Sequence, residues 1–217
     1  MKKIIAIILA VCILATAGFF TAKHFIDKAE NEKEPEPQIG VLARGTTDGN
    51  VYDNTFADFT FTKPEEWNFV TDKGIASLIG YDANKVDMVN LEQTLEELPL
   101  VYDMVAAGDY FYSSSIFVTY ENLMLAVGHT VTNNEYIELL KQKYSEITPT
   151  KYEIVNVREI YFGTNPFTRL TISITSPNAK QSETQYLYFK IIDKYVVNVL
   201  LNIPQDEDVE TYEAMFK

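Results

Sequence analysis

Cysteine and histidine are scarce in this chain of 217 residues, which has one Cys and two His. A single cysteine cannot build an internal disulfide framework or a Cys-rich zinc site. Because Cys12 lies inside a long apolar run, the rest of the chain has no thiol nucleophile. The patterns Gly-x-Ser-x-Gly, Ser-x-x-Lys and His-Glu-x-x-His, which mark several hydrolase classes, are also missing. We therefore predict a non-enzyme with no catalytic, cofactor-binding or metal-ligating residues and no cofactor.

Basic residues are few as well, since 18 Lys and Arg stand against 31 Asp and Glu, for a net charge of −13. Nucleic-acid binding needs clustered positive charge to neutralise phosphates, so a general nucleic-acid partner is excluded. Hydrophobic residues make up 47% of the chain, which is enough for a packed core and excludes wholesale disorder. The length allows one ordinary domain with appendages, or two very small domains.

One long apolar segment is present near the first residues. Lys2 and Lys3 precede residues 4–22, a run of 19 residues without a charged side chain, and Lys23 follows. As a helix this run would span about 28 Å, close to the hydrocarbon thickness of a bilayer. The flanking lysines argue against a buried core helix. Residues 1–28 are therefore predicted to be an N-terminal membrane anchor or signal segment.

The sequence leaves three fates open for this segment. Ala15-Thr16-Ala17 has the small-x-small form of a signal peptidase site, whereas Gly18-Phe19-Phe20 prolongs the apolar run to a full spanning length. Leu9-Ala10-Val11-Cys12 is similar to a lipobox, although Val11 stands where a small residue should precede the lipidated cysteine. An uncleaved anchor is the favoured prediction, ahead of a cleaved signal and a lipoprotein. The expected location is the cell membrane, single-pass with the C-terminal domain outside the cytoplasm, or secretion after cleavage.

Residues 29–47 are predicted to be an acidic linker, because four Glu alternate there with Pro35, Pro37 and other polar residues. Like-charge repulsion and proline stiffness favour an extended spacer of about 40–60 Å. Residues 1–28 contain four Lys and one Asp, so the remaining chain carries a net charge of −16. Anionic lipid headgroups repel such a domain, which indicates that it is tethered to the membrane and does not lie on it.

Residues 48–217 have the pattern of one folded domain. Residues 51–62, which are rich in Phe, are predicted to form one or two short strands, and residues 65–70 the return strand. Thr71-Asp72 is predicted to cap a short helix. Residues 110–120 are rich in β-branched and aromatic side chains and are predicted to form a further strand.

Two longer helical regions are predicted from apolar spacing. In residues 87–107 the spacing continues on both sides of Pro99, so we predict a helical region that is broken at that proline. Thr132-Asn133-Asn134-Glu135 has the form of a capping box, with a hydroxyl for one orphan N–H and a Glu reaching back. The apolar helical face that follows is predicted to end at Pro149.

The C-terminal third has the alternation of an antiparallel meander. Its predicted strands are residues 152–162, 167–175, 185–192 and 195–203. The last strand is apolar on both alternating faces, as is typical of a central strand. Residues 206–216 are predicted to form a short helix with acids in its first turn. The predicted fold class is therefore α+β, an antiparallel β-sheet with helices packed on it.

This order, with a Phe-rich strand running into Lys63-Pro64-Glu65-Glu66-Trp67, resembles the PsbP-like fold family, named after an extrinsic subunit of photosystem II. More closely, the chain is similar to uncharacterised exported proteins of Gram-positive bacteria. They share the proline–acid–Trp strand end, a Tyr-Asp-Met segment (Tyr102-Asp103-Met104) and a Tyr-Glu-Asn-Leu strand end (Tyr120-Glu121-Asn122-Leu123). The resemblance implies an α-β-α sandwich from about Val51 onwards, used as a non-catalytic accessory or binding module. It implies no functional residue.

Four polar features are candidate sites, and each has a simpler structural interpretation. His129 is expected in a loop before the capped helix. Residues 48–53 have a faint calcium-loop pattern but are expected to form a turn. Residues 206–210 are acidic, as the start of a helix often is. The acid pairs Glu65-Glu66 and Glu96-Glu97 suggest glycoside hydrolysis only if two carboxylates face each other.

The many Tyr and Phe residues would suit carbohydrate or peptide binding, although half-buried aromatic residues in strands are ordinary packing. The function predicted from the sequence is a membrane-tethered or exported extracytoplasmic accessory or binding module with an unknown ligand. Its partners would be the membrane, through the N-terminal helix, and an extracytoplasmic protein or glycan. The alternative is an exported hydrolase that uses paired carboxylates.

Overall fold

A computed structural model describes residues 41–78, 91–108, 114–177, 182–204 and 206–217. The predicted membrane segment (residues 1–28) and most of the predicted linker lie outside these residues. Within the described ranges, no helix has the length and apolar character needed to cross a membrane. The predicted anchor is therefore neither supported nor contradicted by the structure.

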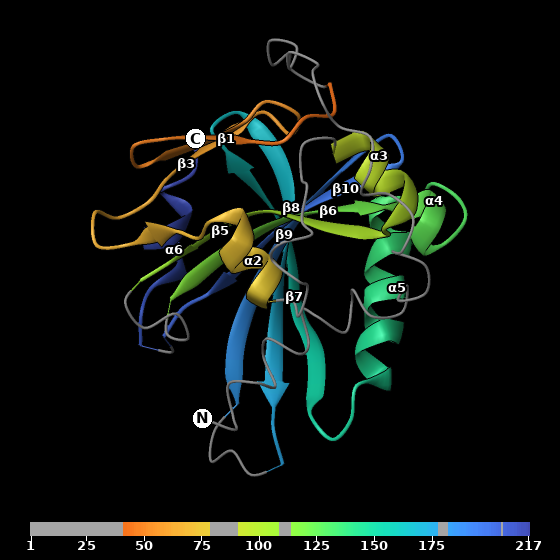
Figure 1. Ribbon diagram of the computed structural model, residues 1–217. Helices are drawn as coiled ribbons and strands as arrows, with labels where there is room; N and C mark the ends of the chain where they lie inside the picture. Colours follow the sequence, from red (N-terminus) through yellow and green to blue (C-terminus); the bar gives the residue numbers. More distant parts are fainter. Residues whose placement is uncertain (1–40, 79–90, 109–113, 178–181, 205) are drawn as a thin grey trace.

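A seven-stranded sheet forms the centre of the domain (Figure 1). Its strands are β4 (Asn68–Phe69), β5 (Leu100–Ala107), β6 (Ser115–Asn122), β7 (Lys151–Phe162), β8 (Asn165–Thr175), β9 (Glu183–Ile192) and β10 (Tyr195–Asn202). They are arranged in the order β4-β5-β6-β10-β9-β8-β7, and every pairing is antiparallel. The meander predicted from residue 152 onwards is confirmed. The prediction of a central strand is also confirmed, because β10 lies between β6 and β9 with both faces buried.

A smaller sheet and several helices complete the fold. The small sheet has the order β1 (Thr46–Asp48), β2 (Val51–Asn54) and β3 (Phe59–Thr62). The described helices are α2 (Asp72–Leu78), α3 (Leu91–Glu97), α4 (Leu123–Ala126), α5 (Asn133–Glu146) and α6 (Val209–Glu213). The structure thus shows a mixed α+β fold with antiparallel sheets and few helices, as the sequence predicted.

The large sheet separates two hydrophobic cores. One face packs against the small sheet, α3 and α6, and this first core is rich in aromatic rings such as Phe61 and Phe162, which both contact Phe216. The other face packs against α5 and forms the second core. Alternate residues of β10 enter the two cores, with Val197 in the first and Val196 in the second. Burial on both faces explains why this strand is apolar throughout.

Helix α5 begins as the sequence predicts. The Thr132 hydroxyl accepts a hydrogen bond from the Glu135 N–H, and the Glu135 carboxylate accepts one from the Thr132 N–H. These bonds satisfy two backbone groups that a helix N-terminus would otherwise leave unpaired. The capping box is therefore confirmed, and α5 ends at Glu146, three residues before Pro149.

The helical region predicted on both sides of Pro99 is wrong in its second half. Residues before the proline form α3, but residues 100–107 form strand β5. A β-bulge interrupts β5 between Tyr102 and Met104. Because of this extra residue, Val101 and Met104 both face the first core, three positions apart. The bulge and burial on both faces give a strand the apolar spacing of a helix.

Two further segments differ from the prediction. Residues 68–69 form strand β4, but it pairs with β5 in the large sheet and is not the return strand of β3. Residues 41–47, expected at the end of the linker, are part of the folded domain: Leu42 packs against the first core and residues 46–48 form β1. Of the strand predicted over residues 110–120, the structure describes residues 114–120, and those from Ser115 onwards lie within β6.

Candidate functional site

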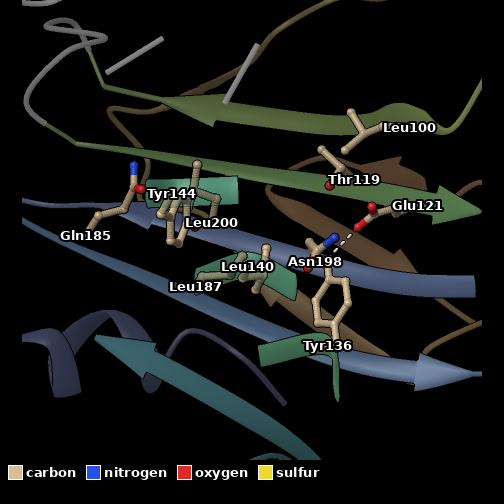
Figure 2. A pocket seen from close by; sticks show the side chains of 10 residues that line it. All are labelled: Leu100, Thr119, Glu121, Tyr136, Leu140, Tyr144, Gln185, Leu187, Asn198 and Leu200. Atoms are coloured by element: carbon tan, nitrogen blue, oxygen red, sulfur yellow. Dashed lines mark hydrogen bonds between the residues drawn. The ribbon is translucent and has the colours of Figure 1, made fainter. Parts of the chain in front are cut away.

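A small pocket lies between α5 and the large sheet, partly open to solvent (Figure 2). Its volume is about 30 Å³, which is room for about two water molecules. Most of the wall is apolar and comes from leucine side chains and the ring of Tyr144. The polar groups among its lining residues belong to Thr119, Glu121, Tyr136, Gln185 and Asn198, and to Tyr144 through its hydroxyl. A cavity of this size does not hold a drug-sized ligand, which needs several hundred Å³.

The spacing of these residues along α5 and β6 brings their side chains together at the pocket. On α5, Tyr136, Leu140 and Tyr144 are four residues apart and therefore lie on one helix face, which is buried. On β6, Thr119 and Glu121 are two residues apart and point to the same side of the sheet. The helix face covers this side of the sheet, so the polar groups of β6 meet those of α5.

Glu121 is the charged group of this pocket, and its side chain is only 7% exposed. One carboxylate oxygen accepts a hydrogen bond of 2.5 Å from the Tyr136 hydroxyl. The other lies 3.0 Å from the Lys143 ammonium, whose side chain is 31% exposed. The Asn198 Oδ1 lies 3.4 Å from the Tyr136 hydroxyl oxygen. The carboxylate is thus held by one neutral donor and one cation, as a buried charge requires.

Tyr136 is itself buried, and its ring packs against Phe189 with 4.9 Å between the ring centroids. Burial and the charge of Glu121 raise the pKa of Tyr136 well above its ordinary value. The phenol therefore stays protonated and donates to Glu121. This fixed donor leaves the second oxygen of Glu121 as the place where a cation is bound.

A second buried carboxylate, Asp103, lies on the opposite face of the sheet. Its Oδ1 accepts a hydrogen bond of 3.1 Å from the Arg44 Nε, and its Oδ2 accepts one of 2.9 Å from the Gly45 N–H and another from the Tyr52 hydroxyl. Arg44 also forms an ion pair with the exposed Asp72 at 3.0 Å. These contacts attach residues 43–45 to β5 and α2.

The same cluster continues through neutral groups of the first core. Asn54 donates to the hydroxyl oxygens of Tyr52 (2.7 Å) and Tyr120 (2.9 Å), and Tyr120 donates to the Ala43 carbonyl at 3.0 Å. Burial raises the pKa of Asp103, while the Arg44 charge and the Tyr52 and Gly45 donors oppose that rise. The contacts of this cluster are those of a structural attachment.

A third polar cluster joins α6 to the strands at the β7 edge. The Arg169 Nη1 lies 2.8 Å from Glu213, whose carboxylate also accepts from the Tyr188 hydroxyl at 3.0 Å. Arg158 lies 3.2 Å from Glu213 and 3.5 Å from Glu210. Two arginines and two glutamates neutralise one another here, and the cluster fixes α6 on the sheet.

The polar side chains predicted as candidate sites lie on the surface. His129 is exposed in the loop before α5, and a ring nitrogen lies 3.1 Å from the Val127 carbonyl. Residues 48–53 contain a turn that leads into a strand, as expected: Gly49, with a φ of 55°, lies in the turn at residues 49–50 between β1 and β2. Asp208 is the N-cap of α6. Within the described residues, no group of three or more His, Cys, Asp or Glu is placed to hold a metal ion.

The acid pairs do not meet in a cleft within the described part of the chain. Glu65-Glu66 and Glu96-Glu97 are exposed. The two buried carboxylates, Asp103 and Glu121, contact different cores, and each is paired with a cation. Retaining and inverting glycosidases need two carboxyl groups about 5–10 Å apart across one bond. These residues do not provide that arrangement.

The residues that carry the buried charges were missed from the sequence. Asp103 and Glu121 belong to the Tyr-Asp-Met and Tyr-Glu-Asn-Leu segments, which carry the resemblance to other exported proteins but no predicted role. Each acid lies within a strand in which almost every other residue is buried. A charged residue within such an apolar strand is a signal for a paired buried group, and it would have identified both.

Comparison with known proteins gives limited information. No family model matches the chain, and no curated protein matches it. Among solved structures, the chain is similar to the solution structure of cyanobacterial PsbP (CyanoP) from Synechocystis sp. PCC 6803, with 11% sequence identity and a TM-score of 0.46. The match covers 81% of this chain and 96% of that chain. The matched protein bears the family name that the sequence resemblance suggested, and at this TM-score nothing about function or partners is transferred from it.

Proposed function

We propose that the protein is a membrane-tethered, extracytoplasmic accessory or binding module. The observation that supports this proposal is the uncharged run of residues 4–22 between Lys3 and Lys23, followed by acidic residues and then by a folded domain. A run of this length matches the hydrocarbon thickness of a bilayer. The resemblance to exported proteins of Gram-positive bacteria agrees with this location.

The pocket beside Glu121 is the proposed binding site of the module. Ligand sites combine apolar walls with a few polar groups, and this mainly apolar pocket has Glu121 and Asn198 among its lining residues. Its small volume favours the end of a side chain from a partner over a whole organic ligand. The acidic chain would then meet its partner outside the membrane, at a distance that the predicted linker sets.

The location is tested by expressing the full chain in a bacterial host and separating membrane from cytoplasm. We expect the protein in the membrane fraction, with the domain removed when intact cells or spheroplasts are treated with protease. Val11→Arg places a charge in the middle of the apolar run and is expected to leave the chain in the cytoplasm. Wild-type protein found in the cytoplasmic fraction would contradict the proposal. N-terminal sequencing of the mature chain separates an anchor from cleavage after Ala17.

The binding site is tested by photo-crosslinking on intact cells. A photoreactive residue at the exposed position Lys141, three residues before the pocket residue Tyr144 on α5, is expected to capture a partner. The matched control is the exposed position Glu96 on α3, a helix that packs on the first core. A pocket partner gives adducts from position 141 alone. The same adducts from both positions, or none from position 141, would place the binding site elsewhere.

A further inference from the structure

Strand β7 gives the large sheet a long open edge. It has twelve residues and stands last in the strand order, so within the described parts of the chain it pairs with β8 alone. The outward N–H and C=O groups of an edge strand can bond to a further strand. At the other edge of the sheet, β4 has only two residues. Of these two edges, β7 therefore offers by far the longer pairing surface.

The middle of β7 is exposed on both faces of the sheet. Residues 155–159 are all exposed, and they include the apolar side chains of Val155 (57%) and Val157 (47%). Charges often protect such an edge, but the charges of β7 sum to zero in a chain with a net charge of −13. They belong to Lys151, Glu153, Arg158 and Glu159. Repulsion between the acidic remainders of two copies is screened beyond about 8 Å at physiological salt, so this neutral strip can approach its own copy.

We propose that β7 is a dimerisation edge, on which the β7 strand of a second copy pairs antiparallel about a two-fold axis. The axis passes beside Asn156, which lies opposite Asn156 of the second copy. A β-bulge makes Val155 an extra residue in β7, so the count of opposed positions skips it. Ile154 then lies opposite Val157 of the second copy, and Glu153 lies opposite Arg158 of the second copy.

The positions of the charges select this register. Residues opposite each other in antiparallel strands point to the same face. Glu153 and Arg158 meet this condition, because they lie opposite residues 173 and 169 of β8, which are four positions apart. Moving the axis to Ile154 would set Lys151 against Arg158, and moving it to Val157 would set Arg158 against Asn156. Neither neighbouring register places a basic side chain opposite an acidic one.

The contacts that these side chains make within one copy do not prevent the pairing. Glu153 is 57% exposed beside Lys151, and Arg158 is 41% exposed beside Glu213. Exposed ion pairs contribute little and rearrange at low cost. The backbone hydrogen bonds and the contact between Ile154 and Val157 of the second copy supply the attraction, while the two charge pairs set the register.

The first test is disulfide trapping of the purified full-length protein in detergent. Cys12→Ser removes the native thiol, and Asn156→Cys then places one thiol beside the axis. Directly opposed residues have Cα atoms about 4.5–5.5 Å apart, a distance that a disulfide spans. Mild oxidation is therefore expected to give covalent dimers.

Glu159→Cys is the matched control, because residue 159 is exposed on the same strand. In the proposed register the two copies of residue 159 are six positions apart, about 20 Å, so no covalent dimer is expected. Equal amounts of dimer from positions 156 and 159, or no dimer from position 156, would overturn the proposal.

The second test exchanges the charges. In a homodimer, Glu153→Arg sets Arg against Arg158, and Arg158→Glu sets Glu against Glu153. Both pairs change from attraction to repulsion, so we expect the dissociation constant of each homodimer to rise at least about fourfold. A mixture of the two variants restores both opposite-charge pairs. We therefore expect heterodimers of about wild-type affinity, measured by resonance energy transfer between differently labelled chains.

Recovery in the mixture separates pairing at this edge from a loss of folding, which mixing does not repair. Unweakened homodimers of both variants, or a mixture of folded variants that stays monomeric, would overturn the proposal. Arg158 also contacts α6, so circular dichroism checks the folding of each variant first, and disulfide trapping decides alone if Arg158→Glu does not fold. Neither test involves the pocket beside α5 or the predicted anchor, so the proposed function stands or falls separately.

Discussion

Asp103 offers the sharpest test of how the domain is held together. Its side chain is fully buried and accepts hydrogen bonds from the Arg44 guanidinium, the Gly45 N–H and the Tyr52 hydroxyl. Asp103→Ala removes the acceptor of all three. Removing one partner of a buried ion pair costs about 3–5 kcal/mol. Arg44 is 23% exposed and keeps Asp72, so we expect the lower end, about 3 kcal/mol.

For a protein of this size a loss of about 3 kcal/mol corresponds to a fall in melting temperature of about 6–12 °C. The assay is thermal unfolding of the full chain in detergent at neutral pH, followed by circular dichroism. Trypsin cleavage after Arg44 gives a second readout. The substitution leaves Arg44 its hydrogen bond to the backbone carbonyl of residue 103 but removes the carboxylate that holds Arg44 and Gly45, so we expect faster cleavage.

The matched control removes the other carboxylate of Arg44. Asp72 is 49% exposed, and exposed ion pairs contribute at most about 1 kcal/mol. Asp72→Asn is therefore expected to lower the melting temperature by about 4 °C or less. If Asp72→Asn destabilises as much as Asp103→Ala, or if Asp103→Ala leaves stability unchanged, the assignment of Asp103 as the attachment point is refuted.

Two further predictions follow from single contacts. Gly45→Ala places a Cβ about 2.2 Å from the Tyr52 ring, and we expect a loss of about 1–3 kcal/mol in urea unfolding; a neutral effect would mean that residues 43–45 do not pack on that ring. Glu135→Gln tests the α5 capping box through its pH dependence. Hydrogen bonds from the backbone and side chain of Thr132 lower the pKa of Glu135 below its ordinary value. The stabilisation from the Glu135 carboxylate is therefore present above the ordinary pKa and is lost as the pH falls through the lowered pKa. The stability gap between wild type and Glu135→Gln, measured from pH 7 to pH 3, is expected to close in acid, and a constant gap would contradict this.

The parts of the fold that follow local rules could be predicted from the sequence. The capping box at Thr132 depends on residues three positions apart, and the meander from β7 to β10 depends on alternation within each strand. Neither needs information about distant segments. Strand pairing is different, because β4 joins β5 across more than 30 residues of sequence. Nothing in the local pattern of residues 65–70 indicates that partner.

Strand β5 shows why apolar spacing alone can mislead. With Val101, Met104 and Val105 buried, the spacing fits one face of a helix, yet Val101 and Met104 face the first core and Val105 faces the second. The bulge beside Asp103 shifts the alternation by one residue. A bulge is selected by tertiary contacts, here the attachment of Arg44 and Gly45 to Asp103.

The two buried acids lie on opposite faces of the large sheet, so each has its own set of partners. Asp103 and Glu121 lie on the neighbouring strands β5 and β6, but each is neutralised on its own face, by Arg44 and Lys143 respectively. Asp103 has its cation in a segment that is continuous with the predicted linker, and it is surrounded by donors of the first core. Glu121 has its cation on a partly exposed side chain beside a pocket. The cation of Asp103 thus belongs to the segment that it attaches, whereas the cation of Glu121 belongs to α5, whose apolar face is also held in the second core. Loss of Asp103 therefore loosens residues 43–45, whereas loss of Glu121 leaves α5 held by its apolar contacts.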